Sequence, residues 1–173
     1  CTLRQVWFFP HAVMETAAKS EAVSASSLGT ELDAEESALL AERMGVISLD
    51  AGEVFASEGE DKRTLFTLAK GRIEVLRTSF KGEEMVHAME LGECAGTRGF
   101  VDGAPRRAKL RAKEPSEVLT LEPWDFEQLI ETHPRIVYKV MRAIFRITHV
   151  NLMRMNQQTD QLQDYFLRTG NRH

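Results

Sequence analysis

Hydrophobic and polar positions alternate through the middle of the chain and recur at helical spacing near its end. Between residues 46 and 121, short alternating runs are separated by turns at Ala51-Gly52, Lys70-Gly71, Lys81-Gly82 and Asp102-Gly103. Such alternation is typical of strands with one buried face. Many short strands at this spacing predict an all-β jelly-roll barrel.

Helical periodicity appears on both sides of this β region. A helix is expected over residues 33–44, where apolar side chains share one side and glutamates the other. Pro123 is expected to open a helix that ends near residue 131. Pro134 opens a longer one, over which no proline or glycine occurs before Gly170.

The long helix carries a heptad-like seam, spaced alternately by four and three residues: Val137, Met141, Ile144, Thr148, Asn151, Met155, Gln158, Leu162 and Tyr165. A helix of about 45 Å is too long to be covered by a barrel of this size alone. We therefore predict a parallel homodimer through residues 134–168, in which half of the seam covers the protein's own barrel. Asn151 in the seam is expected to fix the register of pairing.

Composition narrows the class of protein. The 173 residues are 43% hydrophobic, which suffices for one core, and a net charge of −4 argues against a general nucleic-acid surface. No apolar run reaches the roughly 18 residues that a membrane span needs. Cys1 and Cys94 predict no disulfide framework, which favours a cytoplasmic location.

The first 30 residues divide into two parts. The cluster Val6-Trp7-Phe8-Phe9 is a candidate docking segment for a protein partner, and residues 19–30, rich in Ser and Ala, are interpreted as a linker. Because the chain begins with Cys1 rather than Met, we interpret it as trimmed from a longer sequence.

Arg106 is a candidate anion-binding residue. In the strand expected over residues 106–113, Arg106 begins the inward apolar face, whereas Arg107 begins the outer, basic face. A buried guanidinium is costly unless an acceptor meets it. That acceptor is either an external anion or a carboxylate of the protein, for which the nearby candidates are Glu90, Glu93 and Asp102.

A glycine-rich segment precedes this strand. Gly92, Gly96 and Gly99 flank a short helix expected over residues 97–101. Backbone amides that converge at such a turn suit a phosphate or a carboxylate. The alternative is that these glycines only make turns.

An ordered set of motifs resembles the cyclic nucleotide-binding domain family, which includes the bacterial cyclic AMP receptor protein and protein kinase A regulatory subunits. The resemblance covers residues 32–166 and rests on Leu49-Asp-Ala-Gly52-Glu53-Val54, Glu58-Gly59, Leu65-Phe66-Thr-Leu68, Lys70-Gly71, Ile73-Glu-Val75, Leu91-Gly92-Glu93, Gly103-Ala104-Pro105-Arg106 and Glu117-Val118-Leu119. It implies a jelly roll in which residues 96–106 form the phosphate-binding cassette and Arg106 pairs with the cyclic phosphate.

The cassette departs from the family pattern. The position that ordinarily holds a glutamate, which accepts from the ribose 2′-hydroxyl, is Thr97 here, and Arg98 adds a second cation. Losing a charge-assisted hydrogen bond weakens binding by roughly ten- to a hundred-fold. The resemblance also places Asn151 where the long helix of the family meets the purine base.

Other activities find little support in the sequence. His87 has no second histidine two or four residues away, so no metal site or enzymatic centre is expected. Glu83 and Glu84 are interpreted as a solvated turn, and Cys94 as a packing thiol. The few residues after Phe166 leave no room for a helix-turn-helix, so no DNA-binding module is expected in this chain.

The sequence thus predicts a mainly β protein with helices: a jelly-roll (double-stranded β-helix) barrel flanked by an N-terminal helix and a long C-terminal dimerisation helix. Residues 1–30 form an N-terminal segment and linker, 31–133 the barrel domain and 134–168 the dimer helix. We expect a bacterial regulatory protein that requires no cofactor and senses cyclic AMP, cyclic GMP or another small anion through Gly96, Thr97, Arg98, Gly99, Arg106, Arg107 and Asn151. The alternative is a degenerate, non-binding module for dimerisation or protein interaction.

Overall fold

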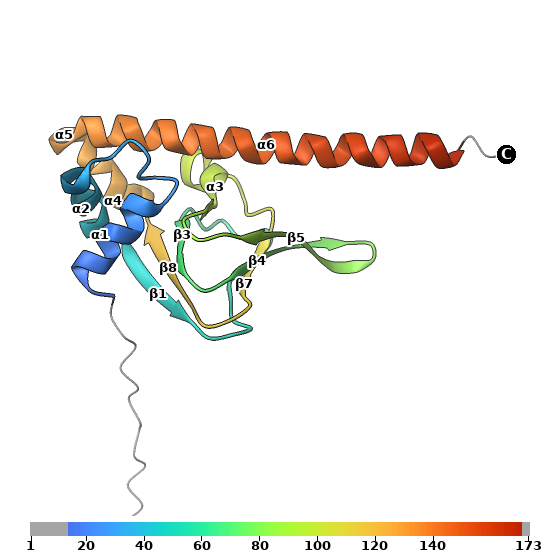
Figure 1. Ribbon diagram of the computed structural model, residues 1–173, viewed down its shortest axis with the longest axis horizontal. Helices are drawn as coiled ribbons and strands as arrows, with labels where there is room; N and C mark the ends of the chain where they lie inside the picture. Colours follow the sequence, from blue (N-terminus) through green and yellow to red (C-terminus); the bar gives the residue numbers. More distant parts are fainter. Residues whose placement is uncertain (1–13, 171–173) are drawn as a thin grey trace, which may run out of the picture.

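The computed structural model describes residues 14–170, so the Val6–Phe9 cluster lies outside the described residues. Within this range eight strands form two antiparallel four-stranded sheets, ordered β1-β8-β3-β6 and β2-β7-β4-β5 (Figure 1). The strands are β1 (Gly45–Leu49), β2 (Val54–Ala56), β3 (Leu65–Lys70), β4 (Ile73–Ser79), β5 (Gly82–Met89), β6 (Cys94–Ala95), β7 (Lys109–Ala112) and β8 (Ser116–Leu121). The predicted jelly-roll barrel with flanking helices is confirmed.

Strand β3 contributes to two hydrophobic cores because its side chains alternate between the two faces of its sheet. Phe66 and Leu68 point between the sheets, where they pack with Ile73 and Leu110. Leu65 belongs to the other core, which lies between this sheet and the helices. The barrel is therefore held from within and also against a helical layer.

The helical layer gathers at one end of the barrel (Figure 1). It contains α1 (Thr16–Ala25), α2 (Ala34–Glu42), α4 (Pro123–Glu127), α5 (Leu129–Thr132) and the start of α6 (Pro134–Gly170). The expected helix after Pro123 is thus broken into two short ones at Gln128. Residues 19–30 are not a linker, because Val23 and Leu28 are fully buried in the helical core.

Helix α2 is fixed at its N-terminus by a capping box. The Asp33 carboxylate accepts from the Glu36 amide at 2.8 Å, and the Glu36 carboxylate accepts from the Asp33 amide at 3.0 Å. Glu36 also pairs with Lys139 of α6, with 2.8 Å between Nζ and Oε2. This carboxylate therefore joins the predicted N-terminal helix to the long helix.

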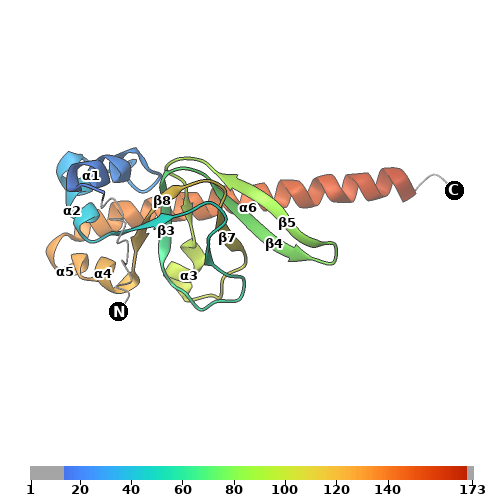
Figure 2. The ribbon, with the colours of Figure 1, turned by 90° about the horizontal axis from the view of Figure 1, so that it is seen from below.

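Helix α6 spans 37 residues, or about 55 Å at 1.5 Å per residue. Its first part packs on the core through Ile136, Val140, Ala143 and Ile144. Its second half extends past the barrel (Figures 1 and 2). The apolar side chains that it exposes include Leu152, Met153, Leu162, Tyr165, Phe166 and Leu167. Among residues 14–170, no helix has the length and apolar character needed to cross a bilayer.

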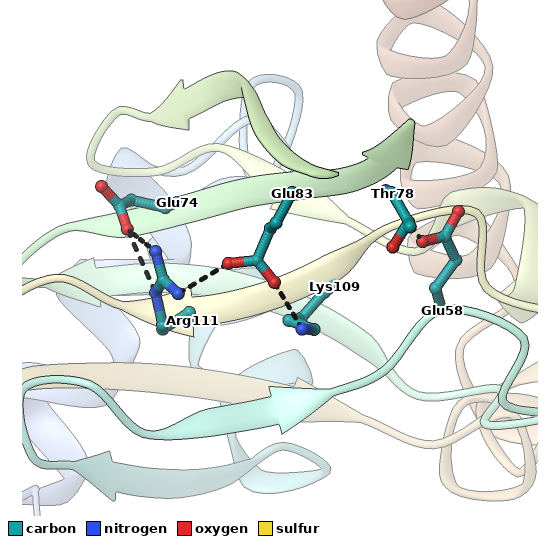
Figure 3. A network of polar contacts seen from close by, with 6 residues as sticks. All are labelled: Glu58, Glu74, Thr78, Glu83, Lys109 and Arg111. Atoms are coloured by element: carbon teal, nitrogen blue, oxygen red, sulfur yellow. Dashed lines mark hydrogen bonds and ion pairs between the residues drawn. The ribbon is translucent and has the colours of Figure 1, made fainter. Parts of the chain in front are cut away.

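Strand β7 is shorter than expected, since it begins at Lys109 rather than Arg106. The predicted alternation holds within it, with Leu110 and Ala112 buried. Its outer face is neutralised by acidic residues of the neighbouring strands: Arg111 pairs with Glu74 and Glu83, and Lys109 with Glu83 (Figure 3). Glu83 is thus exposed, as predicted, but it lies on β5 and takes part in an ion-pair network. The pKa of its carboxyl is lowered, chiefly by the hydrogen bond from Lys109.

Candidate ligand-binding site

A cavity of about 500 Å³ lies between the barrel and α6. Its walls come from β4, β5, the loop before β7, α6 and the short helix α3 (Thr97–Asp102), which matches the predicted one. All seven candidate residues line it: Gly96, Thr97, Arg98, Gly99, Arg106, Arg107 and Asn151. Their role in binding stays a prediction, but the structure brings these separate segments to one place.

Arg106 places a buried cation at this cavity. The residue is only 7% exposed, and its guanidinium lies 4.9 Å from the centre of the Phe66 ring. Nη2 donates to the backbone carbonyl O of Thr64, whereas Nε has no hydrogen-bond partner in the described part of the chain. Burial lowers the pKa of Arg106, but an arginine pKa is high enough for the side chain to stay charged.

The carboxylate partners predicted for Arg106 were wrong. Glu93 pairs instead with His87, with 2.7 Å between Oε2 and Nε2. Glu90 and Asp102 make no ion pair with any residue between 14 and 170. A backbone carbonyl is therefore the acceptor for the Arg106 guanidinium, and its hydrogen-bonding capacity is only partly used.

Gly96 makes room for this guanidinium. Its φ of 93° lies in the left-handed region, which side chains rarely adopt. A Cβ at this position would also lie 1.9 Å from Arg106 Nη1. The glycine thus serves both the turn into α3 and the close approach of Arg106, a second reason that the turn pattern in the sequence did not reveal.

Thr97 is buried and faces α6. Its hydroxyl lies 3.0 Å from the hydroxyl of Thr148, which also lies 2.8 Å from the carbonyl O of Ile144. The side chain at the family's glutamate position is therefore hydrogen-bonded within the protein. Two seam positions, Thr148 and Asn151, lie against the protein's own α3 and cavity.

Several cavity residues were missed by sequence reasoning. His87, Arg77, Arg146 and Arg154 all line the cavity. Two of them could have been predicted from their spacing in the sequence. Arg77 follows Ile73 and Val75 on one face of β4, and Arg154 follows Asn151 by about one helical turn. The pairing of Glu93 with His87 could not, because it depends on how the loop after β5 folds back.

The chemistry of the remaining groups is limited. Burial raises the pKa of the Cys94 thiol to about 12, so the thiol is not ionised near neutral pH. Within residues 14–170, no cluster of three or more His, Cys, Asp or Glu side chains is arranged to hold a metal ion. Six arginines are among the described residues that line the cavity, so most of the charged groups it offers to a ligand are cations.

Comparisons with known proteins agree with this architecture. The model of a cyclic nucleotide-binding domain matches residues 46–133. The cAMP-activated global transcriptional regulator CRP of Salmonella typhimurium is 33% identical over 91 residues, which cover 51% of this chain and 43% of the regulator. A cAMP-dependent protein kinase regulatory subunit of Mycosarcoma maydis is 28% identical over 104 residues, or 57% of this chain and 20% of that subunit. The match therefore spans less than half of each curated relative.

Solved structures show the same fold. A cyclic nucleotide-binding domain from Methylobacillus flagellatus superposes with a TM-score of 0.73 at 20% identity and covers 87% of this chain and 83% of that chain. The catabolite activator protein of Thermus thermophilus gives a TM-score of 0.71 at 24% identity, over 80% of this chain and 63% of that one. The N-terminal domain of a transcriptional regulator from Streptomyces coelicolor gives 0.68 at 26% identity, over 75% and 94%.

Proposed function

The chain belongs to the cyclic nucleotide-binding domain family, and from this premise we propose that it is a regulatory sensor whose cavity binds a cyclic nucleotide or another small anion. The proposal rests mainly on the surroundings of the Arg106 guanidinium. A buried guanidinium normally has all of its donors paired, yet Nε has no partner among residues 14–170 and the side chain lines an open cavity. An anionic ligand would supply the acceptor.

The ligand's effect is transmitted through α6 in this proposal. The helix lines the cavity at Asn151 and contacts α3 through Thr148, and its exposed apolar half extends beyond the barrel. We propose that this half pairs with α6 of a second copy as a parallel coiled coil. A ligand that binds one arrangement of the helix pair better than the other then shifts the population towards it.

We also propose that this sensor is bacterial and works in the cytoplasm. The curated regulator that the chain resembles comes from a bacterium, which supports a bacterial origin. Cys94 is a free, buried thiol, as expected in a reducing cytoplasm. Both curated relatives are named as regulators, and we assign no catalytic step to this chain.

A second candidate function is supported by Thr97. Its hydroxyl is bonded to Thr148, and Arg106 already donates to a carbonyl of the protein. Both observations also fit a module that dimerises through α6 without a ligand.

Calorimetric titration with cyclic AMP and cyclic GMP at low salt separates the two functions. We expect micromolar binding by the full chain, and a loss of roughly ten- to a hundred-fold in Arg106→Gln. Arg135→Gln is the matched control, because Arg135 lies exposed on α6 away from the cavity. No heat at millimolar nucleotide would leave either the module that binds no ligand or a sensor for a different anion.

A further inference from the structure

The cavity carries more positive charge than one phosphate would neutralise. Among residues 14–170, Glu93 is the one carboxylate that lines it, and six arginines do so: Arg77, Arg98, Arg106, Arg107, Arg146 and Arg154. Glu93 is paired with His87, and Arg146 with Glu31. The other five arginines make no ion pair with any residue between 14 and 170. Solvent screens the exposed Arg98 and Arg107, and Glu60 and Glu122 act on Arg106 from a longer distance. The charges of the partly buried Arg77 and Arg154 are screened less, and an anion between them would stabilise them.

These cations lie at two places along the cavity. Arg106 lies beside Gly96, and therefore near the point where Thr97 meets Thr148 of α6. Arg154 lies six residues further along α6, which corresponds to about 9 Å. Both residues line the same cavity, so they are two separate positions in one site.

We group Arg77 with Arg154 rather than with Arg106. Arg77 lies on β4 two residues after Val75, on the same face of the strand and nearer to the turn between β4 and β5. Figures 1 and 2 show that this hairpin and the second half of α6 extend in the same direction. Arg77 and Arg154 are both partly buried, which makes an unneutralised charge on each more costly than at the surface.

We propose that the ligand of this site is a nucleotide with two phosphate groups, one bound at Arg106 and the second between Arg77 and Arg154. This inference rests on the proposed function and specifies its ligand. A cyclic mononucleotide has one negatively charged phosphate and leaves Arg77 and Arg154 without a counter-charge. Arginine binds phosphate oxygens through paired N–H donors, so two separated groups of arginines match two phosphates. A cavity of about 500 Å³ lies within the usual range for nucleotide-sized ligands.

Calorimetric titration of the full chain with three probe classes tests the proposal. The probes are cyclic AMP with its one phosphate, cyclic di-AMP and adenosine 3′,5′-bisphosphate with two, and glutarate as a small dicarboxylate. The variants are Arg77→Gln and Arg154→Gln, and Arg135→Gln is the control on the same helix. A thermal melt of each variant verifies that it is folded.

We expect one of the two-phosphate probes to bind at least about tenfold more tightly than cyclic AMP. Arg77→Gln and Arg154→Gln should each weaken that probe about tenfold and leave cyclic AMP nearly unchanged. Cyclic di-AMP and the bisphosphate distinguish a cyclic dinucleotide from a linear nucleotide as the source of the two phosphates.

Other outcomes overturn the inference. If cyclic AMP binds as tightly as the two-phosphate probes, or if the Arg77 and Arg154 variants behave like Arg135→Gln, the second phosphate site does not exist although the proposed sensor function stands. Tighter binding of glutarate than of either two-phosphate probe would also contradict it. If no probe binds, the proposed function fails and this inference fails with it.

Discussion

Thr97 of α3 and Thr148 of α6 are joined by a hydrogen bond between their hydroxyl groups, with 3.0 Å between the oxygens. Thr97 is 6% exposed, so water competes little for this contact. The pair connects the candidate phosphate-binding segment directly to the helix that continues beyond the barrel. The residue at the position of the family's glutamate therefore forms a hydrogen bond to α6 in this chain.

Two substitutions of Thr97 should distinguish a contact with the ribose from the contact with α6. In Thr97→Glu a carboxylate becomes available to the ribose 2′-hydroxyl, and we expect cyclic AMP to bind roughly ten- to a hundred-fold more tightly, as measured by calorimetry. Thr97→Val is the control, since it removes the hydroxyl and adds no carboxylate. If valine tightens binding as much as glutamate does, the gain comes from releasing α3 from α6 and not from a ribose contact.

Gly96→Ala should impair both stability and ligand binding. The new Cβ would meet Arg106 Nη1 at 1.9 Å, in addition to the cost of a positive φ of about 1–2 kcal/mol. Gly103→Ala is a matched control, because its φ of 68° is also positive but the atom nearest to its new Cβ, Arg63 Nε, lies 3.6 Å away. Chemical denaturation should show a larger loss for Gly96→Ala. Equal losses would mean that the Arg106 side chain moves aside without cost.

The contact between Glu36 and Lys139 should make stability depend on pH in the acidic range. The Lys139 ammonium and the Asp33 amide lower the pKa of the Glu36 carboxyl below its usual 4.5. A carboxyl whose pKa is lower in the folded state stabilises the protein above its unfolded pKa, and this contribution is lost as the pH falls through the folded value. Glu36→Gln should therefore lower the free energy of unfolding at pH 7 by up to about 1 kcal/mol.

Thermal or urea unfolding between pH 3 and 7 measures this effect. The difference between the wild-type chain and Glu36→Gln should narrow below about pH 4.5 and vanish at the acidic limit. Glu35→Gln serves as the control, because Glu35 is an exposed neighbour that makes no ion pair with any residue between 14 and 170. A difference that is constant across the pH range would show that the contact does not act through ionisation.

Dimerisation through α6 predicts a strong effect at Leu162. This side chain is 58% exposed in the single chain and lies on the heptad seam. Leu162→Asp would bury a charge in the helix pair, and it should weaken the dimer on the order of a hundredfold by sedimentation equilibrium. Gln163→Asp places the same charge on another face of that turn and should leave the dimer intact. A wild-type chain that sediments as a monomer at high micromolar concentration would contradict the dimer.

The sequence predicted the barrel and α6 because their signals are local. Alternation in β7 and the proline that begins α6 depend only on neighbouring residues. The linker prediction for residues 19–30 was wrong because Ser and Ala give no periodic pattern, although Val23 and Leu28 are buried by distant helices. The acceptor for Arg106 could not be predicted either. It is the carbonyl of Thr64, the residue before β3, and it comes close to Arg106 only in the folded chain.

The proposed sensor requires an anion to reach Arg106, and an NMR titration that follows the Nε–H signal of this side chain tests the contact most directly. The signal is assigned by its loss in Arg106→Lys. Because Nε has no partner in the described part of the free protein, we expect the signal to shift as the nucleotide is added and to stop shifting at saturation. An unchanged signal at a nucleotide concentration that saturates other resonances would show that the ligand binds elsewhere, and it would contradict the assigned site.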